Sequence, residues 1–204
     1  MNQNDRQLNG KLYNVNEVDN NWIQARKVCK KFNDSLFWED TTALEELKKI
    51  FKSAGDNFVL TPPFYCDHGS KISFGDHIYA NTGFTILDEN EVKIGNYVFI
   101  GPHVSIYTSA HPIDSSIRNT NLEIAKPVTI GNSVWIGGNT VINPGVTIGN
   151  DVVLGSGSVV TKDIPNHVIA AGNPCRVLRE ITKKDKEYWN QQYFDYLNDK
   201  DIRK

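Results

Sequence analysis

The stretch that decides the fold runs from residue 127 to residue 164 and reads PVTIGNSVWIGGNTVINPGVTIGNDVVLGSGSVVTKDI. Within it an aliphatic residue returns at every sixth position, at Ile130, Ile136, Ile142, Ile148, Leu154 and Val160. A helix repeats near 3.6 residues and a strand near 2, so neither period explains a register of six. Units of six residues are typical of a parallel β-helix, in which each unit forms one short strand and a turn and three units make one triangular coil.

The positions four residues after these aliphatic side chains are small or β-branched: Val134, Thr140, Val146, Val152, Ser158 and Ile164. We expect the aliphatic side chains to fill the interior of the prism and the smaller ones to lie where the chain turns a corner. The predicted fold is therefore mainly β.

The same register appears upstream at Ile94, Ile100 and Ile106, and the interval from Ile106 to Ile130 is a multiple of six. The chain is therefore expected to leave the β-helix after Ile106 and to rejoin it in phase. The loop between, residues 107–126, has the length of a functional loop on a rigid scaffold. A further repeat at residues 71–78 is out of phase with Ile94, which predicts a short irregular segment near residues 88–90.

The two ends of the chain show helical spacing instead. An apolar helical face is formed by Trp22, Ala25, Cys29 and Phe32, and residues 42–45 (TALE) are predicted to be a capping box that opens a second helix. Residues 182–185 (TKKD) resemble a third helix start, followed by Trp189, Tyr193 and Leu197 on one face. We expect an N-terminal helical cap over residues 1–55, a β-helix over residues 56–180 and a C-terminal helix over residues 181–204, with the helices covering the ends of the β-helix.

The length and composition predict a single globular domain. The chain has 204 residues and a formal net charge of −2, so neither nucleic acid nor an anionic membrane is an expected partner. Its three cysteines, Cys29, Cys66 and Cys175, are far apart and are expected to be reduced thiols. We expect a cytoplasmic protein, because the N-terminus has no basic and apolar targeting segment.

Several motifs together resemble the maltose and galactoside O-acetyltransferase family, which belongs to the hexapeptide-repeat acetyltransferases. They are residues 10–13 (GKLY), 79–81 (YAN), 109–112 (SAHP), 127–138 (PVTIGNSVWIGG), 143–149 (NPGVTIG), 160–165 (VTKDIP) and 171–176 (AGNPCR). The resemblance extends from about residue 8 to about residue 185. It implies a left-handed parallel β-helix, a homotrimer, and acetyl transfer from acetyl-CoA to a sugar hydroxyl in a cleft between neighbouring subunits, without a metal.

His111, on the predicted loop, is the candidate general base. A hydroxyl attacks a thioester only as its proton is removed, and a neutral imidazole suits that task near neutral pH. The resemblance gives the same role to the histidine of this motif. Glu123, on the returning arm of the loop, is predicted to orient His111 or to hold the acceptor. The other histidines, His68, His77, His103 and His167, lie outside the motif and are expected to be structural or solvent-facing.

The resemblance also implies binding residues. Asn81 and Asp88 match acceptor-binding positions, Tyr79 offers a flat apolar face beside them, and Asp67 is a weaker candidate because its surroundings depart from the family pattern. For acetyl-CoA, small residues along the arm and cations near the phosphates are expected; the matching positions are Gly101, Gly138, Ser156, Thr161, Lys162, Arg176 and Arg179. Trp135 is expected to pack beside the pantetheine chain. Family members often have an acidic residue just after GKLY, but this chain has NVN at residues 14–16, which leaves the sugar open.

Three alternatives stay open on the sequence. The acceptor could be a xenobiotic alcohol instead of a galactoside-like or maltose-like sugar. A zinc hydratase of the γ-carbonic anhydrase type uses the same prism but needs two histidines five residues apart, a spacing that this chain lacks. A non-catalytic β-helix that binds a partner on its flat faces would leave the His111 loop without a role.

Overall fold

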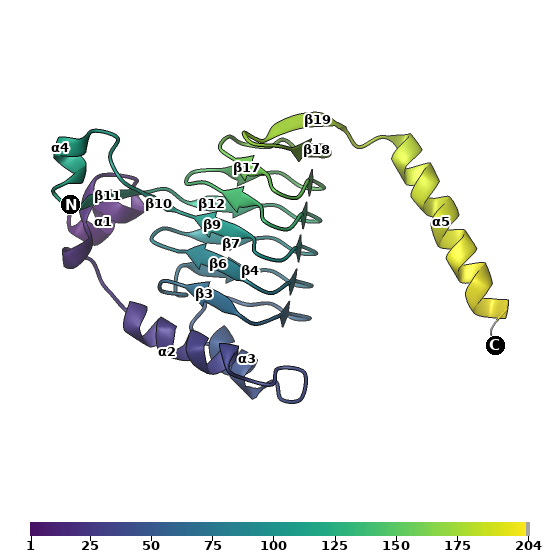
Figure 1. The fold of residues 1–204 in the computed structure, drawn as a ribbon, viewed down its shortest axis with the longest axis horizontal. Coiled ribbons are helices and arrows are strands. Elements are labelled where there is room, and N and C mark those ends of the chain that lie inside the picture. Colours follow the sequence, from purple (N-terminus) through teal and green to yellow (C-terminus); the bar gives the residue numbers. More distant parts are fainter. Residues whose placement is uncertain (203–204) are drawn as a thin grey trace.

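The computed structural model describes residues 1–202 and shows a triangular β-helix with helices at both ends of the chain (Figure 1). Parallel strands stack into three faces. The first face contains β4 (Ile72–Phe74), β7 (Val92–Ile94), β12 (Val128–Ile130) and β15 (Thr147–Ile148). The second face contains β2 (Val59–Leu60), β5 (Tyr79–Ala80), β8 (Phe99–Ile100), β13 (Trp135–Ile136), β16 (Val153–Leu154), β18 (Val168–Ala171) and the antiparallel β19 (Arg176–Glu180). The third face contains β3 (Phe64–Cys66), β6 (Phe84–Leu87), β9 (Ser105–Tyr107), β14 (Val141–Ile142) and β17 (Val159–Val160).

The six-residue repeat forms the core, as predicted. The aliphatic positions pair in register between coils, for example Ile94 with Ile130 and Ile130 with Ile148. All of them are buried, and so are the small or β-branched residues four positions later. Each coil therefore places both sets of side chains in the interior, where their burial favours folding.

A ladder of side-chain amides explains why so many repeats begin with Gly-Asn. The Asn132 Oδ1 atom accepts the backbone N–H of Asn96 at 2.8 Å, and the Asn150 Oδ1 atom accepts that of Asn132 at 2.7 Å. A Cβ on Gly131 would lie 2.7 Å from that same Asn150 Oδ1 atom. Glycine is therefore required where one coil passes over the amide of the next.

Both predicted interruptions of the repeat are present. The buried residues Ile86 and Ile94 are eight positions apart rather than six, and the extra residues lie in the irregular segment 88–91. The chain leaves the prism after β9 and returns at β12, which pairs with β7 in phase. The loop itself contains β10 (Ser109–Ala110), α4 (Ser115–Arg118) and β11 (Leu122–Ala125).

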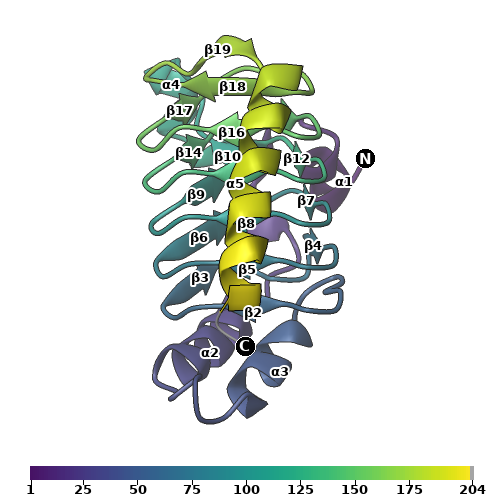
Figure 2. The ribbon, with the colours of Figure 1, turned by 90° about the vertical axis from the view of Figure 1, so that its right-hand side faces the viewer.

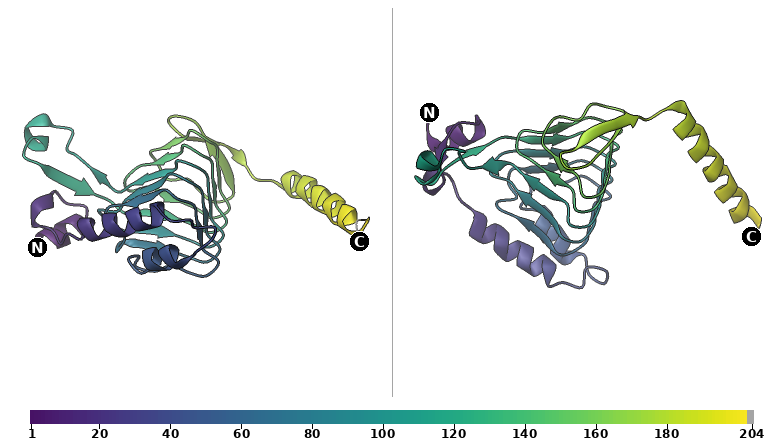
Figure 3. Two further views of the ribbon diagram at one scale, coloured as in Figure 1. Left: turned by 60° about the horizontal axis from the view of Figure 1, so that its bottom comes forward. Right: turned by 45° about the horizontal axis from the view of Figure 1, so that its top comes forward.

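The N-terminal segment covers one end of the β-helix and also supports the loop. Its elements are α1 (Gln3–Leu8), β1 (Tyr13–Asn14), a 3-10 turn η1 (Val15–Glu17), α2 (Trp22–Asn33) and α3 (Thr42–Lys48). Helices α2 and α3 lie across the end formed by the first coil (Figures 1 and 3), and the Asn33 side chain exchanges hydrogen bonds with the backbone of Phe64 on β3. Strand β1 instead pairs with β11 of the loop.

The predicted capping box at residues 42–45 is wrong. Thr42 is already inside α3, and the preceding Thr41 makes no side-chain cap. The Asp40 carboxylate accepts hydrogen bonds from the backbone and hydroxyl of Thr42 instead, at 2.8 and 2.6 Å. An acidic side chain two positions earlier thus takes over the expected function of the threonine.

The C-terminal helix begins where the sequence predicts but does not cover the end of the β-helix. Helix α5 (Lys183–Ile202) runs alongside the second face without packing against it (Figures 1 and 2). The free edge at this end is covered by β19, which folds back antiparallel on β18. The last two residues of the predicted helical segment, 203–204, lie outside the described residues. Among the described helices, none is both long and apolar enough to cross a membrane.

Candidate active site

A groove of about 620 Å³ runs along the corner between the second and third faces, which we call the groove corner. Six of the predicted site residues line it: Tyr79, Asn81, Gly101, Trp135, Gly138 and Ser156. Successive coils stack tightly there, with the Gly157 N–H donating to Gly138 O at 2.9 Å. The groove therefore follows the stacking direction of the β-helix.

Two glycines at this corner have different constraints. A Cβ on Gly101 would lie 2.5 Å from the backbone N of Gly138, so Gly101 is required for the coils to stack. A Cβ on Gly138 would lie 3.0 to 3.1 Å from Pro102, which is tight but leaves some space for adjustment. Ser156 is exposed and therefore the most replaceable of the small residues lining the groove.

An apolar wall borders the groove on the second face. Tyr79, Phe99 and Trp135 lie on neighbouring strands in direct register and point outward. Their exposed fractions are 40, 54 and 57 %. Phe99 and Pro102 were not among the predicted site residues, although the register of the repeat places Phe99 between the two aromatic residues that were. A long, slender ligand could lie between this wall and the small residues of the corner.

The four residues expected near phosphates do not lie together. Arg176 follows the turn 172–175, in which Gly172 and Cys175 bond to Ser158 and Val159 just past the groove corner. Thr161 and Lys162 follow β17 and precede Ile164, which bridges to Ile148 on the first face. They therefore lie at the corner between the third and first faces, which we call the loop corner.

Arg179 is engaged elsewhere. Its guanidinium makes a bidentate ion pair with Asp185 of α5, with both distances 2.7 Å. This pairing lowers the pKa of the Asp185 carboxyl well below its ordinary value. Arg179 thus contacts the first turn of α5 and is not among the residues that line the groove, and its contact with CoA stays a prediction.

His111 and Glu123 lie together at the loop corner, as predicted. Strands β10 and β11 pair antiparallel, with Ala110 opposite Ile124, so the next residues along, His111 and Glu123, come side by side. The His111 Nε2 atom is 3.9 Å from Glu123 Oε1, and the His111 side chain is 57 % exposed. The imidazole is thus open to solvent on one side and next to a carboxylate on the other.

Glu123 is held by a residue from the other end of the chain. Tyr13 on β1 is opposite Glu123 on β11, and its hydroxyl donates to Glu123 Oε2 at 2.8 Å. Tyr13 is fully buried, and burial raises the pKa of its hydroxyl, with the negative charge of Glu89 adding to the effect. The hydroxyl therefore stays protonated and donates to Glu123.

A polar network continues from Tyr13 to the base of the loop. Gln7 Nε2 donates to Glu89 Oε2 at 2.6 Å, and the other Glu89 oxygen is 3.0 Å from His68 Nε2. His68 is buried, and its Nδ1 atom is 2.8 Å from Asn21 Oδ1. His68 is thus structural, in agreement with the sequence expectation. Glu89 was missed, because nothing in its local sequence shows that residues 7, 13 and 68 surround it.

A small pocket of about 280 Å³ opens beside this network. Val15, Asn16, Trp22, Arg26, Asp67, His68 and Glu89 are among its lining residues. Burial raises the pKa of Asp67 to about 6, and Glu89 and Asp88 add to the shift. Arg26 lies over the Trp22 ring at 5.5 Å and 4.0 Å from Asp67. Asp67, the weaker acceptor candidate, is therefore the one that faces a pocket at the loop corner.

Asp88 does not line this pocket. It is fully buried, and its Oδ1 atom accepts the backbone N–H groups of Asp67 and His68 at 3.0 and 2.9 Å. Its Oδ2 atom has no partner among the described residues, and burial raises its pKa. Asp88 thus lies beneath the pocket, where it holds the backbone of Asp67, and its contact with the acceptor stays a prediction.

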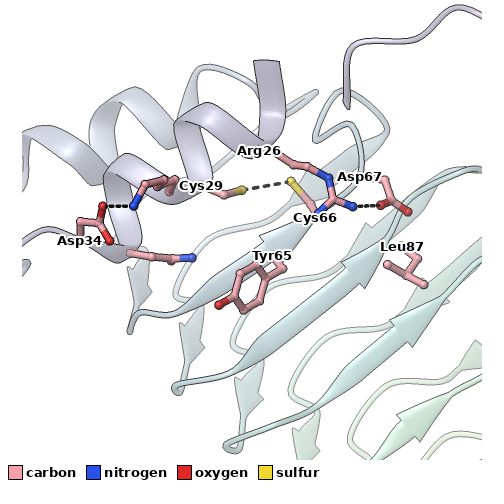
Figure 4. A pocket seen from close by; sticks show the side chains of 9 residues that line it. Arg26, Cys29, Asp34, Tyr65, Cys66, Asp67 and Leu87 are labelled. Atoms are coloured by element: carbon pink, nitrogen blue, oxygen red, sulfur yellow. Dashed lines mark hydrogen bonds and ion pairs between the residues drawn. The ribbon is translucent and has the colours of Figure 1, made fainter. Parts of the chain in front are cut away.

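A neighbouring pocket of about 510 Å³ lies between α2 and the third face (Figure 4). Cys29 on α2 and Cys66 on β3 face each other there, with their sulfur atoms 3.7 Å apart. Both are free thiols, as is Cys175. Hydrogen bonding to Cys29 and burial raise the pKa of the Cys66 thiol. The pair packs α2 against the β-helix as two reduced cysteines.

The groove and His111 lie at opposite edges of the third face. Tyr79, Asn81 and Gly138 belong to the groove corner, whereas His111, Glu123 and the small pocket belong to the loop corner. Within one chain the groove and the His111–Glu123 pair therefore do not meet. Among the described residues, no three His, Cys, Asp or Glu side chains converge to hold a metal.

Known proteins share the sequence and the fold. Residues 127–162 match the family model described as bacterial transferase hexapeptide (six repeats). The galactoside O-acetyltransferase of Escherichia coli strain K12 is 40 % identical over 171 residues, which is 84 % of this chain and 84 % of that protein. The chain belongs to the maltose and galactoside O-acetyltransferase family.

Solved structures of this family agree. A maltose O-acetyltransferase from Clostridium difficile 630 superposes with a TM-score of 0.80 at 41 % identity, over 89 % of this chain and 98 % of that one. A galactoside acetyltransferase in complex with coenzyme A gives a TM-score of 0.82 at 40 % identity, over 91 % of this chain and 94 % of that one. The predicted family is confirmed, and a family structure that holds coenzyme A agrees with the predicted donor.

Proposed function

We propose that this protein transfers the acetyl group of acetyl-CoA to a hydroxyl of a galactoside-like or maltose-like sugar, with His111 as the general base. The observation that supports this best is the His111–Glu123 pair, which the loop presents at its exposed edge. The names of the relatives supply the donor and the class of acceptor.

The groove corner is the proposed donor half of the site. Small residues at Gly138 and Ser156 leave space for the extended arm of acetyl-CoA, and Trp135 offers an apolar surface beside it. Arg176, near the end of the groove corner, supplies positive charge for the phosphates. Lys162 and Thr161 lie at the loop corner, so a second copy would supply their positive charge and hydroxyl to the phosphates.

The loop corner is the proposed acceptor half. Glu123 next to His111 Nε2 favours the tautomer with the proton on Nε2, which leaves Nδ1 free to accept a proton. The acceptor oxygen then attacks the thioester carbonyl carbon as its proton passes to His111. When the tetrahedral intermediate collapses, the C–S bond breaks and the proton goes to the sulfur, giving an acetyl ester and free CoA.

Side chains at the small pocket and in the groove offer groups for a sugar. Asp67 at the pocket and Asn81 in the groove are the proposed hydrogen-bonding partners of hydroxyls, and Tyr79 and Trp22 offer flat faces for the sugar ring. Because Asn81 and Tyr79 lie at the groove corner, they act on an acceptor held at the loop corner of a second copy. We propose a homotrimer with three such sites, the assembly that the family resemblance implies. In a closed ring of three copies, each copy contacts the next through the same two corners.

A panel assay tests the transfer. The protein is mixed with acetyl-CoA and each of a series of acceptors, and release of the CoA thiol is followed together with the mass of the acetylated product. Turnover is expected with galactosides, maltose or related sugars and not with acceptors that lack a hydroxyl. Acetylation of xenobiotic alcohols with no sugar turnover would contradict the proposed acceptor class, and no thiol release with any acceptor would contradict the transfer.

A further inference from the structure

Two cysteines from separate parts of the chain face each other in this fold. Cys29 lies in α2 and Cys66 ends β3, 37 positions later, and their Sγ atoms are 3.7 Å apart (Figure 4). The third cysteine, Cys175, bonds through its backbone to β17, which lies at the opposite end of the third face from β3. The proposed acetyl transfer uses neither Cys29 nor Cys66, so that reaction gives the pair no role.

A pocket gives small molecules a path to both sulfur atoms. Although only 3 % of Cys29 and 4 % of Cys66 is exposed, both residues line the pocket of about 510 Å³ between α2 and the third face. A water molecule takes up about 30 Å³ in the liquid. The pocket therefore admits a reagent as small as hydrogen peroxide.

The two thiols differ in reactivity. Hydrogen bonding from Cys66 lowers the pKa of the Cys29 thiol against the opposing effect of burial, and the positive charge of Arg26 adds a smaller lowering. The pKa of Cys66 is raised by its hydrogen bond to Cys29 and by burial, and burial also raises that of Cys175. Because the thiolate is the nucleophile, Cys29 is the thiol that reacts first, and Cys66 is the neighbour that can resolve its oxidised form.

The sulfur atoms need only a small movement to bond. A disulfide has an S–S distance of about 2.0 Å, so the two atoms would approach each other by roughly 1.7 Å. Helix α2 contacts β3 through side chains, among them Asn33, whose amide bonds to the backbone of Phe64. Because α2 belongs to no sheet, it can shift by this amount without breaking a strand ladder.

We infer that Cys29 and Cys66 form an oxidative modification site, at which hydrogen peroxide converts the two thiols to a disulfide that joins α2 to β3. Cys29 Sγ loses its proton and attacks one peroxide oxygen, the O–O bond breaks, and the released hydroxide takes up that proton as water. Cys66 Sγ then attacks the sulfur of the resulting sulfenic acid, the S–O bond breaks, and the hydroxyl leaves with the Cys66 proton as a second water. This chemistry is independent of the proposed acetyl transfer.

Peptide mapping after peroxide treatment tests the site. Full-length protein is treated with hydrogen peroxide, the remaining thiols are blocked under denaturing conditions, and the peptides are mapped by mass without reduction. We expect a link between Cys29 and Cys66, with the protein lighter by two hydrogen atoms and Cys175 still a free thiol. A dithiol reductant should restore all three thiols. Three free thiols after treatment, or oxidation of Cys175 as fast as that of the pair, would overturn the inference.

Single variants test the assigned order of attack. In Cys66→Ser the sulfenic acid of Cys29 has no resolving thiol, so dimedone, which traps sulfenic acids, should label residue 29. Cys29→Ser should give at least tenfold less label at Cys66, because that thiol stays protonated. The matched control, Cys175→Ser, should form the disulfide as fast as the wild type. Stronger labelling of Cys66 than of Cys29 would contradict the assigned roles.

Hydrogen exchange measures what the disulfide does to α2. A bond between residues 37 positions apart restricts the open states of the segment between them, so the backbone amides of α2 should exchange at least tenfold more slowly after oxidation. The amides of α5 should not change, and peroxide-treated Cys66→Ser should exchange like its own untreated form. Unchanged exchange in α2 of the disulfide form would contradict the joining of α2 to β3.

Discussion

His111 and Glu123 face each other across the short antiparallel pair β10–β11, with Nε2 3.9 Å from Oε1. The pair lies on the loop that interrupts the six-residue repeat, and β1 pairs with β11 of that loop. A rigid scaffold thus presents a partly exposed imidazole beside a carboxylate that is itself held by Tyr13. This relationship leads to the predictions below.

Removal of the His111 imidazole should abolish proton transfer but leave the groove intact. Turnover of His111→Ala is expected to fall by roughly 10²–10⁴, the usual contribution of a general base. Affinity for CoA, measured by calorimetry, should stay near that of the wild type, because the proposed role of His111 is to take a proton from the acceptor and not to bind the CoA chain. If the variant keeps more than about a tenth of wild-type turnover, a loss far below the usual contribution, the base is another group.

Tyr13→Phe should weaken turnover through Glu123. The change removes the hydroxyl that donates to Glu123 Oε2, so the carboxylate loses a fixed position next to His111. We expect turnover to fall about tenfold, or about 1.4 kcal/mol, with little change in the KM for acetyl-CoA. Stability should fall by about 1 kcal/mol, since one hydrogen bond in a buried setting is lost. Wild-type turnover in a variant with that loss of stability would show that Tyr13 only supports the fold.

The amide ladder should contribute measurably to stability. Asn132→Ala removes the acceptor of the Asn96 N–H and should cost about 1 kcal/mol, or roughly 2–4 °C in Tm for a chain of this size. The control is Asn143→Ala, because the Asn143 side chain makes no hydrogen bond to the described residues. Thermal unfolding that shifts equally in both variants would mean that the ladder adds nothing specific.

Asp67 should make stability depend on pH. Its pKa is raised by burial from 3.8 to about 6, with Glu89 and Asp88 opposing its ionisation and His68 and Arg26 favouring it. The folded state therefore binds more protons than the unfolded state between these values, so this group's contribution falls as pH rises through that window and its cost is complete above about 6. Asp67→Asn removes the titrating group. Urea unfolding should show the variant gaining on the wild type as pH rises, and a constant difference would contradict the shift.

The repeat could be predicted from the sequence because every coil places the same side chains in the same environment. Ile130 and Ile148 show this directly, since the six-residue period puts them in register three units apart. The cap of α3 and the packing of α5 could not be predicted in the same way. A helix start such as residues 182–185 shows where a helix begins but not what its side chains contact, and the Arg179–Asp185 ion pair joins two separate elements.

The site was predictable to the extent that it follows the repeat or a motif. Gly138 and Ser156 lie in the groove because the register fixes their corner, and the SAHP motif locates His111. Glu89 and Trp22 could not be found, because the contacts that define their roles come from residues far along the chain. Asp88 matched a motif position, but its burial and the two backbone N–H groups of a neighbouring coil that donate to its Oδ1 atom could not be read from that motif.

Complementation between two inactive variants tests the central claim, that each site combines the groove of one copy with the His111 of another. His111→Ala lacks the base, and Ser156→Trp blocks the groove at an exposed corner position. The two chains are co-expressed with different tags and purified through both tags in turn. In a trimer that contains both variants, one of the three sites combines the intact groove of a His111→Ala copy with the intact His111 of a Ser156→Trp copy. The activity per trimer should therefore return to about a third of the wild-type value. Mixed protein as inactive as its parents would contradict the account, because a site built within one chain leaves every copy with one lesion.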